Sequence, residues 1–279
     1  MNGQIKQIIR DKYFIILGIV LLLAYFPTLI DLVSDWYNDA NYSHSFLIPL
    51  ISGYLIWQKR KSLEQIELSS NGFGLFLIIL GLGFFIIGNG ASEYFTVRFS
   101  LVVTITGIIL YHFGSRFFKN IWFALFFLLF MIPIPYVIYF SATFPMQIFA
   151  SKVTVHLLDI IGMAAVRQGN IIHLSNQSLE VAEACSGMRS LVSLLALGAL
   201  FAYFHQKRFS AQLILFLSTI PIAVVANVFR VFVTSVIVYT SPDLRVTDEP
   251  LHSIMGASVF VIAFILLLIF GAILRKIFK

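Results

Sequence analysis

The chain has 279 residues, of which 59% are hydrophobic and 11% are charged, and its mean hydropathy is +0.93. Soluble domains are about half apolar and a quarter charged, so these values exclude a soluble globular protein and indicate an integral membrane protein. The formal charge of +6 does not indicate nucleic-acid binding, because the basic residues form short clusters between apolar runs, a pattern typical of membrane orientation.

Eight apolar runs approach the length of about 20 residues that crosses a hydrocarbon core of ~30 Å as a helix. In chain order they are Tyr13–Leu32, Tyr42–Trp57, Phe73–Gly88, Val97–Phe113, Ile121–Phe140, Ser186–Phe204, Ala211–Val231 and Ser253–Leu274. The first has the basic start of a signal peptide but no small-residue cleavage site, so we expect a retained anchor. The sequence therefore predicts an all-α polytopic membrane protein with about eight transmembrane helices.

The basic residues between these runs predict the orientation of the chain. Most of them lie in five alternate segments: Lys6, Arg10 and Lys12; Lys59, Arg60 and Lys61; Arg116 and Lys119; Lys207 and Arg208; Arg275, Lys276 and Lys279. Positively charged loops stay in the cytosol, so we expect these segments and both termini to be cytosolic. The opposite loops hold most of the acidic residues and are expected outside.

Residues 141–184 are expected to form an extracytoplasmic cap on a single domain of residues 1–279. Thr143–Val166 is apolar enough for a ninth span, but such a span would move the later basic segments outside. It is better interpreted as an amphipathic helix on the outer membrane surface, because three polar residues fall within two turns: Lys152, His156 and Asp159. The following stretch "RQGNIIHLSNQSLEVA" has a turn-like "SNQS" between two alternating runs and predicts a small β-hairpin.

Three reactive side chains are expected at one membrane face. Cys185 begins the sixth run, Arg230 lies at the end of the seventh, and His252 begins the eighth. Counting depth at 1.5 Å per residue brings all three to the outer face from three different helices. As the only cysteine, Cys185 excludes an internal disulfide and any metal site built from several thiolates.

Each of these residues also has a structural interpretation. A free cysteine often packs as a small hydrophobe, and His252 lies beside an acidic loop where an interfacial histidine is ordinary. Arg230 is harder to explain in this way, because nine apolar or small residues follow it, and an arginine inside a membrane span is expected to face protein or a cavity.

Together the three residue types provide the chemistry of a cysteine peptidase. A thiol ionises more readily at a helix N-terminus, where the first-turn amides of Ser186 and Gly187 would favour a thiolate at Cys185 and hold an oxyanion. The His252 imidazole would take the thiol proton and return it to a leaving amine. Arg230 would stabilise the thiolate or the oxyanion.

Two charged neighbours of the thiol also require a role. Arg189 lies four residues after Cys185, on the same helical face, and is a second candidate for stabilising negative charge. Glu183 lies two residues before the thiol and should oppose its ionisation unless it pairs with one of the arginines.

Three sequence blocks, "VAEACSGMRSL", "NVFRV" and "LHSIMG", resemble the signature blocks of the exosortase/archaeosortase family, which carry its Cys, Arg and His in this order. Other blocks of the family agree in the same order: "YSHSFLIPL", "LLFMIPIP", "PMQIFAS" and "RQGNIIHL". The resemblance implies a multispanning cysteine peptidase that acts as a transpeptidase. Its substrates are exported proteins that end in a short motif of the PEP type, a transmembrane helix and a basic tail, and the acyl group passes to a surface or lipid acceptor.

The resemblance assigns roles to individual residues. Cys185 would be the nucleophile, Arg230 the catalytic arginine and His252 the acid/base. Archaeosortases tend to have arginine at the third position, so His252 favours a bacterial exosortase in the cytoplasmic membrane, with its active site at the extracytoplasmic face. Asn227 in "NVFRV" and His44 in "YSHS" are candidates for supporting or substrate-binding roles, although many members have glycine in place of Ser45. No cofactor or metal is implied.

Two other functions use different residues. A metal hydrolase would use residues of the outer side, but no HxxxH or HExxH spacing connects them: His44, His173, Glu183 and His252. A transporter or lipid-handling protein with a structural cysteine would line a polar path with arginines such as Arg98, Arg189 and Arg230. That function predicts more polar residues at mid-depth than the third and fifth runs contain.

Overall fold

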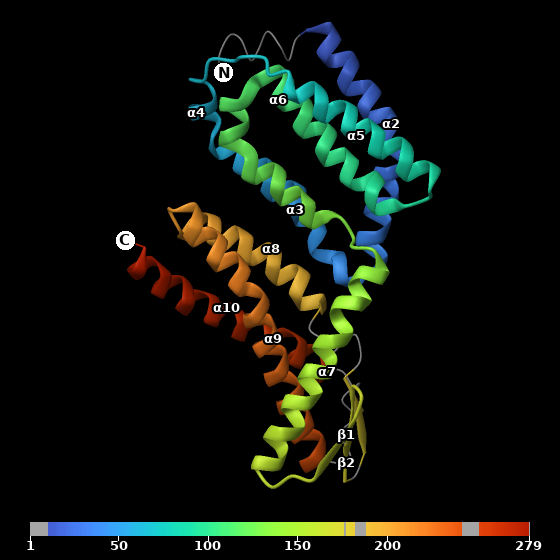
Figure 1. Cartoon of the computed structure of the whole chain (residues 1–279), viewed down its shortest axis with the longest axis vertical. Coiled ribbons are helices and arrows are strands. Elements are labelled where there is room, and N and C mark those ends of the chain that lie inside the picture. The colour runs from blue at the N-terminus through green and yellow to red at the C-terminus, as the bar shows by residue number, and fades with distance from the viewer. Residues whose placement is uncertain (1–10, 176, 182–187, 242–250, 279) are drawn as a thin grey trace. The chain divides into compact units, whose positions relative to one another are not determined.

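The computed structural model describes residues 11–175, 177–181, 188–241 and 251–278 (Figure 1). The chain divides into two compact units, Met1–Ile134 and Pro135–Lys279.

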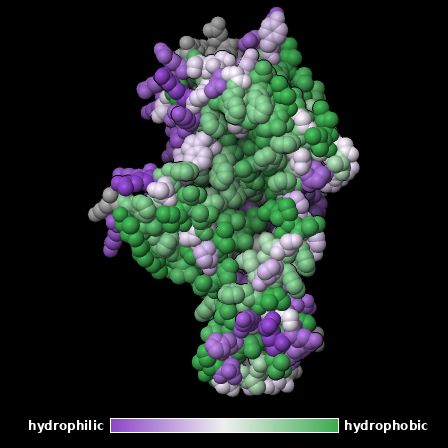
Figure 2. Space-filling view, in the orientation of Figure 1, coloured by the Kyte–Doolittle hydropathy of each residue, from purple (hydrophilic) through white to green (hydrophobic). Residues whose placement is uncertain are grey.

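Five described helices are long and apolar enough to cross a membrane: Lys12–Asn38, Phe73–Gly90, Tyr94–Met131, Phe209–Thr240 and Ile254–Ile277. Apolar side chains cover much of the visible helical surface (Figure 2), and many large hydrophobic residues are more than half exposed. A soluble protein would bury such surface, so a multi-pass membrane protein is confirmed. The predicted number of eight spans is not confirmed.

The difference from eight arises at the second, fourth, fifth and sixth runs. Among the described residues, the sixth run corresponds to the shorter apolar helix Leu191–His205. The second run consists of a 3₁₀ helix, η1 (Ala40–Phe46), and of α3 (Leu47–Gln58), which has only 12 residues. The fourth and fifth runs are merged in α6 (Tyr94–Phe127) and the 3₁₀ helix η2 (Leu128–Met131). Pro133 and Pro135 follow η2, so the end of the predicted fifth run belongs to the next helix.

Unit 1 contains α2 (Lys12–Asn38), η1, α3, α4 (Arg60–Leu63), α5 (Phe73–Gly90), α6 and η2. The hairpin of α5 and α6 is held by close backbone approach, since glycines at positions 74, 81 and 88 of α5 are all buried. A Cβ atom at Gly81 would lie 3.0 Å from the backbone nitrogen of Thr104. Small residues of this kind let membrane helices pack closely. The hydroxyl of Tyr25 on α2 hydrogen-bonds to Ser100 Oγ at 2.8 Å and joins α2 to this hairpin.

The start of α6 is capped by a carboxylate. Glu93 accepts hydrogen bonds from the backbone N–H groups of Phe95 (3.1 Å) and Thr96 (2.7 Å). Desolvation alone would raise the pKa of Glu93, but the hydrogen bonds from Thr96 and Phe95 and the charge of Arg98 lower that pKa below its ordinary value. Glu93 therefore stays ionised at neutral pH.

A single glycine breaks α6 at the position where the sequence separates its fourth and fifth runs. Gly114 has φ +84° and ψ 178°, a region of backbone space that is essentially restricted to glycine. A Cβ atom there would also collide with the carbonyl oxygen of Ser69, which precedes α5. The break and the approach of Ser69 both require the absence of a side chain.

We therefore expect Gly114→Ala to destabilise unit 1 by about 2 kcal/mol or more, because strain and steric conflict add. The melting temperature of the detergent-solubilised protein measures this effect. Gly83→Ala is the matched control, since Gly83 is helical and a Cβ there would meet no atom within 4 Å. Equal melting temperatures for the two variants would show that the break does not depend on glycine.

Unit 2 begins with α7 (Tyr136–Ile160), followed by a three-stranded antiparallel sheet in the order β1-β2-β3. The strands are β1 (Ala165–Gln168), β2 (Ile171–Leu174) and β3 (Ser178–Glu180). Strands β2 and β3 form the predicted hairpin around "SNQS", so that prediction is confirmed. Strand β1 was not predicted. It pairs with β2 through the turn at Gly169 (φ +63°).

The helix of the expected cap also exists, but with different bounds and surroundings. It begins at Tyr136 instead of Thr143, and it ends at Ile160, just before Gly162 with φ +78°. Val166 belongs to β1 and not to this helix. One face of α7 is buried along its whole length, at residues 139, 143, 147, 150, 151, 154 and 158. Its orientation relative to the membrane stays a prediction.

Three helices complete unit 2: α8 (Met188–His205), α9 (Phe209–Thr240) and α10 (Leu251–Ile277). Leu191 and Leu194 of α8, Ala226 of α9 and Val259 of α10 belong to one buried cluster, together with Tyr139 of α7. Farther along α7, Leu158 packs with Val238 of α9 and with the sheet. Helix α7 therefore follows the second half of α9 in the same direction.

Candidate functional site

The described part of the candidate site is centred on Arg230 of α9. The helix has 32 residues, or about 48 Å, so it is longer than the ~30 Å hydrocarbon core. Arg230 lies inside this helix and not at its end, since α9 continues to Thr240. Its side chain is only 5% exposed. A buried arginine is costly, so its position must be supported by neighbouring groups.

Two buried polar residues share the helical face of Arg230. Asn227 and Thr234 lie three residues before and four residues after it, a spacing that puts them on the same side of the helix. Asn227 is 2% exposed, and its Oδ1 atom accepts no hydrogen bond in the described part of the chain. The sequence alone drew attention to Asn227 but not to Thr234, although the spacing is visible in "NVFRVFVT".

The N-terminus of α8 lies at the level of Arg230. Helices α8 and α9 are antiparallel neighbours, and a Cβ atom at Gly198 would lie 3.1 Å from Thr219 Cγ2. Met188, the first residue of α8, comes ten residues before Gly198. Arg230 comes eleven residues after Thr219. Because both helices rise by about 1.5 Å per residue, the start of α8 lies at the level of Arg230.

The same argument gives the level of His252. Helix α10 is antiparallel to α9, and a Cβ atom at Gly271 would lie 3.4 Å from Leu215 Cδ2. His252 comes 19 residues before Gly271, and Thr234 comes 19 residues after Leu215. The backbone of His252 is thus level with Thr234, about one turn from Arg230. The side chain of His252 lies outside the described part of the structure.

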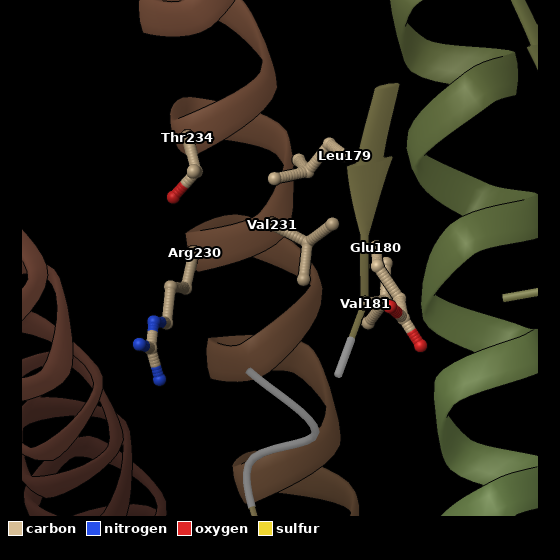
Figure 3. Close-up of a pocket in the computed structure, with 6 residues that line it drawn as sticks. All are labelled: Leu179, Glu180, Val181, Arg230, Val231 and Thr234. Atoms are coloured by element: carbon tan, nitrogen blue, oxygen red, sulfur yellow. The ribbon is translucent and has the colours of Figure 1, made fainter. Parts of the chain in front are cut away.

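Strand β3 forms the other wall of a small cavity beside Arg230 (Figure 3). The lining residues are Leu179, Glu180, Val181, Arg230, Val231 and Thr234. Val231 points toward β3, whereas Arg230 and Thr234 project from the opposite side of α9. The carboxylate of Glu180 points away from the arginine. This contribution of β3 was not predicted, because β3 and the part of α9 near Arg230 are far apart in the sequence.

Several predicted site residues lie outside the described residues: Glu183, Cys185, Ser186 and Gly187. Arg189 belongs to the first turn of α8, but its side chain is not among those described. His44 lies in η1 of unit 1, where its ring stacks on that of Tyr42 at 6.4 Å between centroids. Of the predicted catalytic residues, Arg230 is the one whose side chain is described. The backbone of α8 begins at its level, and that of α10 begins about one turn away.

Comparison with known families adds the decisive observation. Residues 36–269 match the family described as "Transmembrane exosortase". The chain belongs to the transmembrane exosortase family. No curated protein and no solved structure matches the chain. The family match confirms the resemblance based on the sequence blocks.

The matched range of this exosortase extends over both compact units. It includes Cys185, Arg230 and His252, as well as His44 in unit 1. Family membership supports a membrane cysteine peptidase or transpeptidase as the class of the protein, while the roles of single residues depend on the local chemistry. Within the described residues, no group of three or more His, Cys, Asp and Glu side chains is arranged to hold a metal ion.

Proposed function

We propose that this exosortase cleaves the C-terminal sorting signal of exported proteins through a thioester on Cys185 and transfers them to a surface or lipid acceptor. The observation that carries the proposal is the buried Arg230 at the level where α8 and α10 begin. Cys185 precedes α8 by three residues, and His252 is the second residue of α10. A cation, a thiol and an imidazole from three segments form a composite site of the kind that acyl transfer requires.

The chain connectivity supports a thiol near Arg230. Cys185 is four residues after Val181, which lines the cavity beside Arg230, and three residues before Met188. Three or four residues span at most about 11–14 Å. The amides of Ser186 and Gly187 would add hydrogen-bond donors for an anion at this position.

The reaction starts when the Cys185 thiolate attacks the carbonyl carbon of the scissile peptide bond. The negative charge moves to the carbonyl oxygen, where Arg230 stabilises it. The C–N bond then breaks as His252 gives the leaving nitrogen the proton that it took from the thiol. The products are a thioester and a membrane-tailed fragment with a free amine. A water molecule or an acceptor nucleophile attacks the thioester and releases the thiol.

The remaining residues have supporting roles in this proposal. Asn227 offers a buried amide one turn before Arg230, and Arg189 offers a second cation one turn after Cys185. Glu183 would pair with an arginine and limit its mobility, because a free carboxylate beside the thiol would oppose its ionisation. His44 is a candidate substrate-binding residue.

The charge pattern supports the direction of the reaction across the membrane. Basic segments stay in the cytosol, so both termini would be cytosolic and the thiol would face the extracytoplasmic side of a bacterial cytoplasmic membrane. Substrates that have been exported present their cleavage motif on that side, while their transmembrane helix remains in the bilayer. The partners are therefore membrane-tailed proteins and the bilayer itself.

A trapped intermediate tests the function directly. When the purified enzyme is mixed with a membrane-tailed substrate and quenched in acid, we expect an adduct between Cys185 and the N-terminal substrate fragment. Peptide mass spectrometry locates the adduct, and neutral hydroxylamine should release it because thioesters are labile to that amine. Cleavage without any adduct on Cys185, or an adduct on another residue, would contradict the proposal.

His252→Gln is expected to lower the rate of processing by about 10²–10⁴-fold, since the general acid and base is removed. The pH dependence of the processing rate should also lose the limb that reflects titration of the His252 imidazole. His173→Gln is the matched control, because this histidine hydrogen-bonds to Ser178 within the sheet (Nδ1 to Oγ, 2.7 Å) and has no proposed role in the reaction. An unchanged pH profile in His252→Gln would assign proton transfer to another group.

A further inference from the structure

A polar pocket in unit 1 shares no lining residue with the set proposed for catalysis. Three segments line it: Pro27, Thr28 and Asp31 of α2; Gly88 and Asn89 of α5; and Ser92, Glu93, Tyr94, Val97 and Arg98 around the start of α6. It lies where the candidate span α5 ends and the candidate span α6 begins. This position corresponds to the boundary between hydrocarbon and lipid headgroups.

The pocket contains a buried cation. Arg98 is 5% exposed, and its Nη2 atom forms an ion pair of 2.7 Å with Asp35 Oδ2. Its guanidinium also lies over the ring of Tyr94, 5.6 Å from the centroid. The Nε atom is buried and has no hydrogen-bond partner in the described part of the chain. A buried N–H without an acceptor is unfavourable, so an acceptor oxygen placed next to Arg98 would be favourable.

Two carboxylates give the pocket an excess of negative charge. Asp35 pairs with Arg98, which leaves the carboxyl groups of Asp31 and Glu93 as further acidic groups of the pocket lining. Asp31 is exposed and forms no ion pair with any described residue. A simple anion would be repelled by these carboxylates, while a simple cation would leave Arg98 Nε without an acceptor. The chemistry fits a ligand that carries a positive group and an anionic oxygen together.

The surroundings of the pocket indicate the bilayer as the source of this ligand. Large apolar side chains within two residues of the pocket lining in the sequence are more than half exposed on α2 and α5: Phe26, Ile30, Ile86 and Ile87. Because α2 and α5 are candidate spans, these side chains would face the hydrocarbon of the bilayer and offer contact surface for acyl chains.

We propose that this pocket binds the headgroup of a phospholipid that carries a primary amine, with the ammonium at Asp31 and Glu93 and a phosphate oxygen at Arg98. A primary ammonium donates hydrogen bonds to carboxylates, whereas a quaternary choline group cannot. A phosphatidylglycerol headgroup has no cation. Lipid binding at this site is independent of the proposed thiol chemistry.

Native mass spectrometry of the detergent-purified full chain tests the proposal. Phosphatidylethanolamine, phosphatidylcholine and phosphatidylglycerol with identical acyl chains are added at equal concentration. We expect wild type to retain about fivefold more phosphatidylethanolamine than either other lipid, the ratio expected for one charge-assisted contact near a surface. Equal retention of the three lipids by wild type would overturn the proposal without any need for a variant.

A variant and a soluble headgroup sharpen this test. Asp31→Asn should lose the preference, while Asp159→Asn, another exposed carboxylate at the end of α7, should keep it. A preference that survives Asp31→Asn would overturn the assigned site. Glycerophosphoethanolamine lacks acyl chains and should compete only weakly. Competition as strong as that of the lipid would show that the pocket takes a soluble phosphoamine, which would overturn the assignment to the bilayer.

Discussion

Replacing Cys185 by alanine is expected to abolish processing of a co-expressed substrate that ends in a short motif, a transmembrane helix and a basic tail. Without the sulfur atom no thioester forms, and the loss of a nucleophile lowers an acyl-transfer rate by about 10⁴-fold or more. The measurement is the shift of the substrate on an immunoblot, from the precursor to the cleaved form. Cys185→Ser should be nearly as inactive, because a hydroxyl is a much weaker nucleophile at neutral pH.

The controls separate catalysis from folding. Both variants change only a small side chain, so their amounts in the membrane and their melting temperatures should stay close to those of wild type. A transporter or lipid-handling protein with a structural cysteine would leave substrate processing independent of these substitutions. Full processing by Cys185→Ala would end the thiol-peptidase proposal, whereas loss of processing together with loss of the protein from the membrane would support a structural role.

The helices were predictable because each apolar run carries its own signal. Hydropathy located the helices that correspond to α2, α5, α9 and α10, and the structure confirms them as candidate spans. The second run failed as a span because hydropathy does not distinguish a 3₁₀ turn from an α-helix, and only the 12 residues of α3 are α-helical. The geometry of Gly114 depends on its contact with Ser69 from another segment, which no local window contains.

The candidate site was predictable to the extent that a charge in an apolar run is unusual. Arg230 stood out for this reason, and the structure places it in a buried position. The contribution of β3 could not be predicted, since it depends on how the sheet packs against α9. The polar pocket around Arg98 was missed for the same reason: its charged residues come from α2 and from the start of α6, which are far apart in the sequence.

Arg230→Lys is expected to lower the processing rate by about 10²–10³-fold although the charge is retained. A guanidinium presents donors in a planar fork that matches a carboxylate or a developing oxyanion, and a lysine ammonium cannot reproduce that geometry from a buried helical position. The loss should appear mainly in kcat, because the interaction strengthens as negative charge develops on the carbonyl oxygen. Steady-state cleavage of a membrane-tailed peptide in detergent measures both parameters.

A second readout distinguishes this role from a structural one. If Arg230 stabilises the thiolate, Arg230→Gln should raise the pKa of Cys185 observed in the pH dependence of alkylation by iodoacetamide, whereas Arg230→Lys should largely preserve it. Thr234→Val is the matched control, since it changes the neighbouring buried residue without changing the charge. Wild-type cleavage by Arg230→Lys would show that charge alone is sufficient. An alkylation profile unchanged by Arg230→Gln would place the arginine outside the reach of the thiolate and restrict it to holding the helices together.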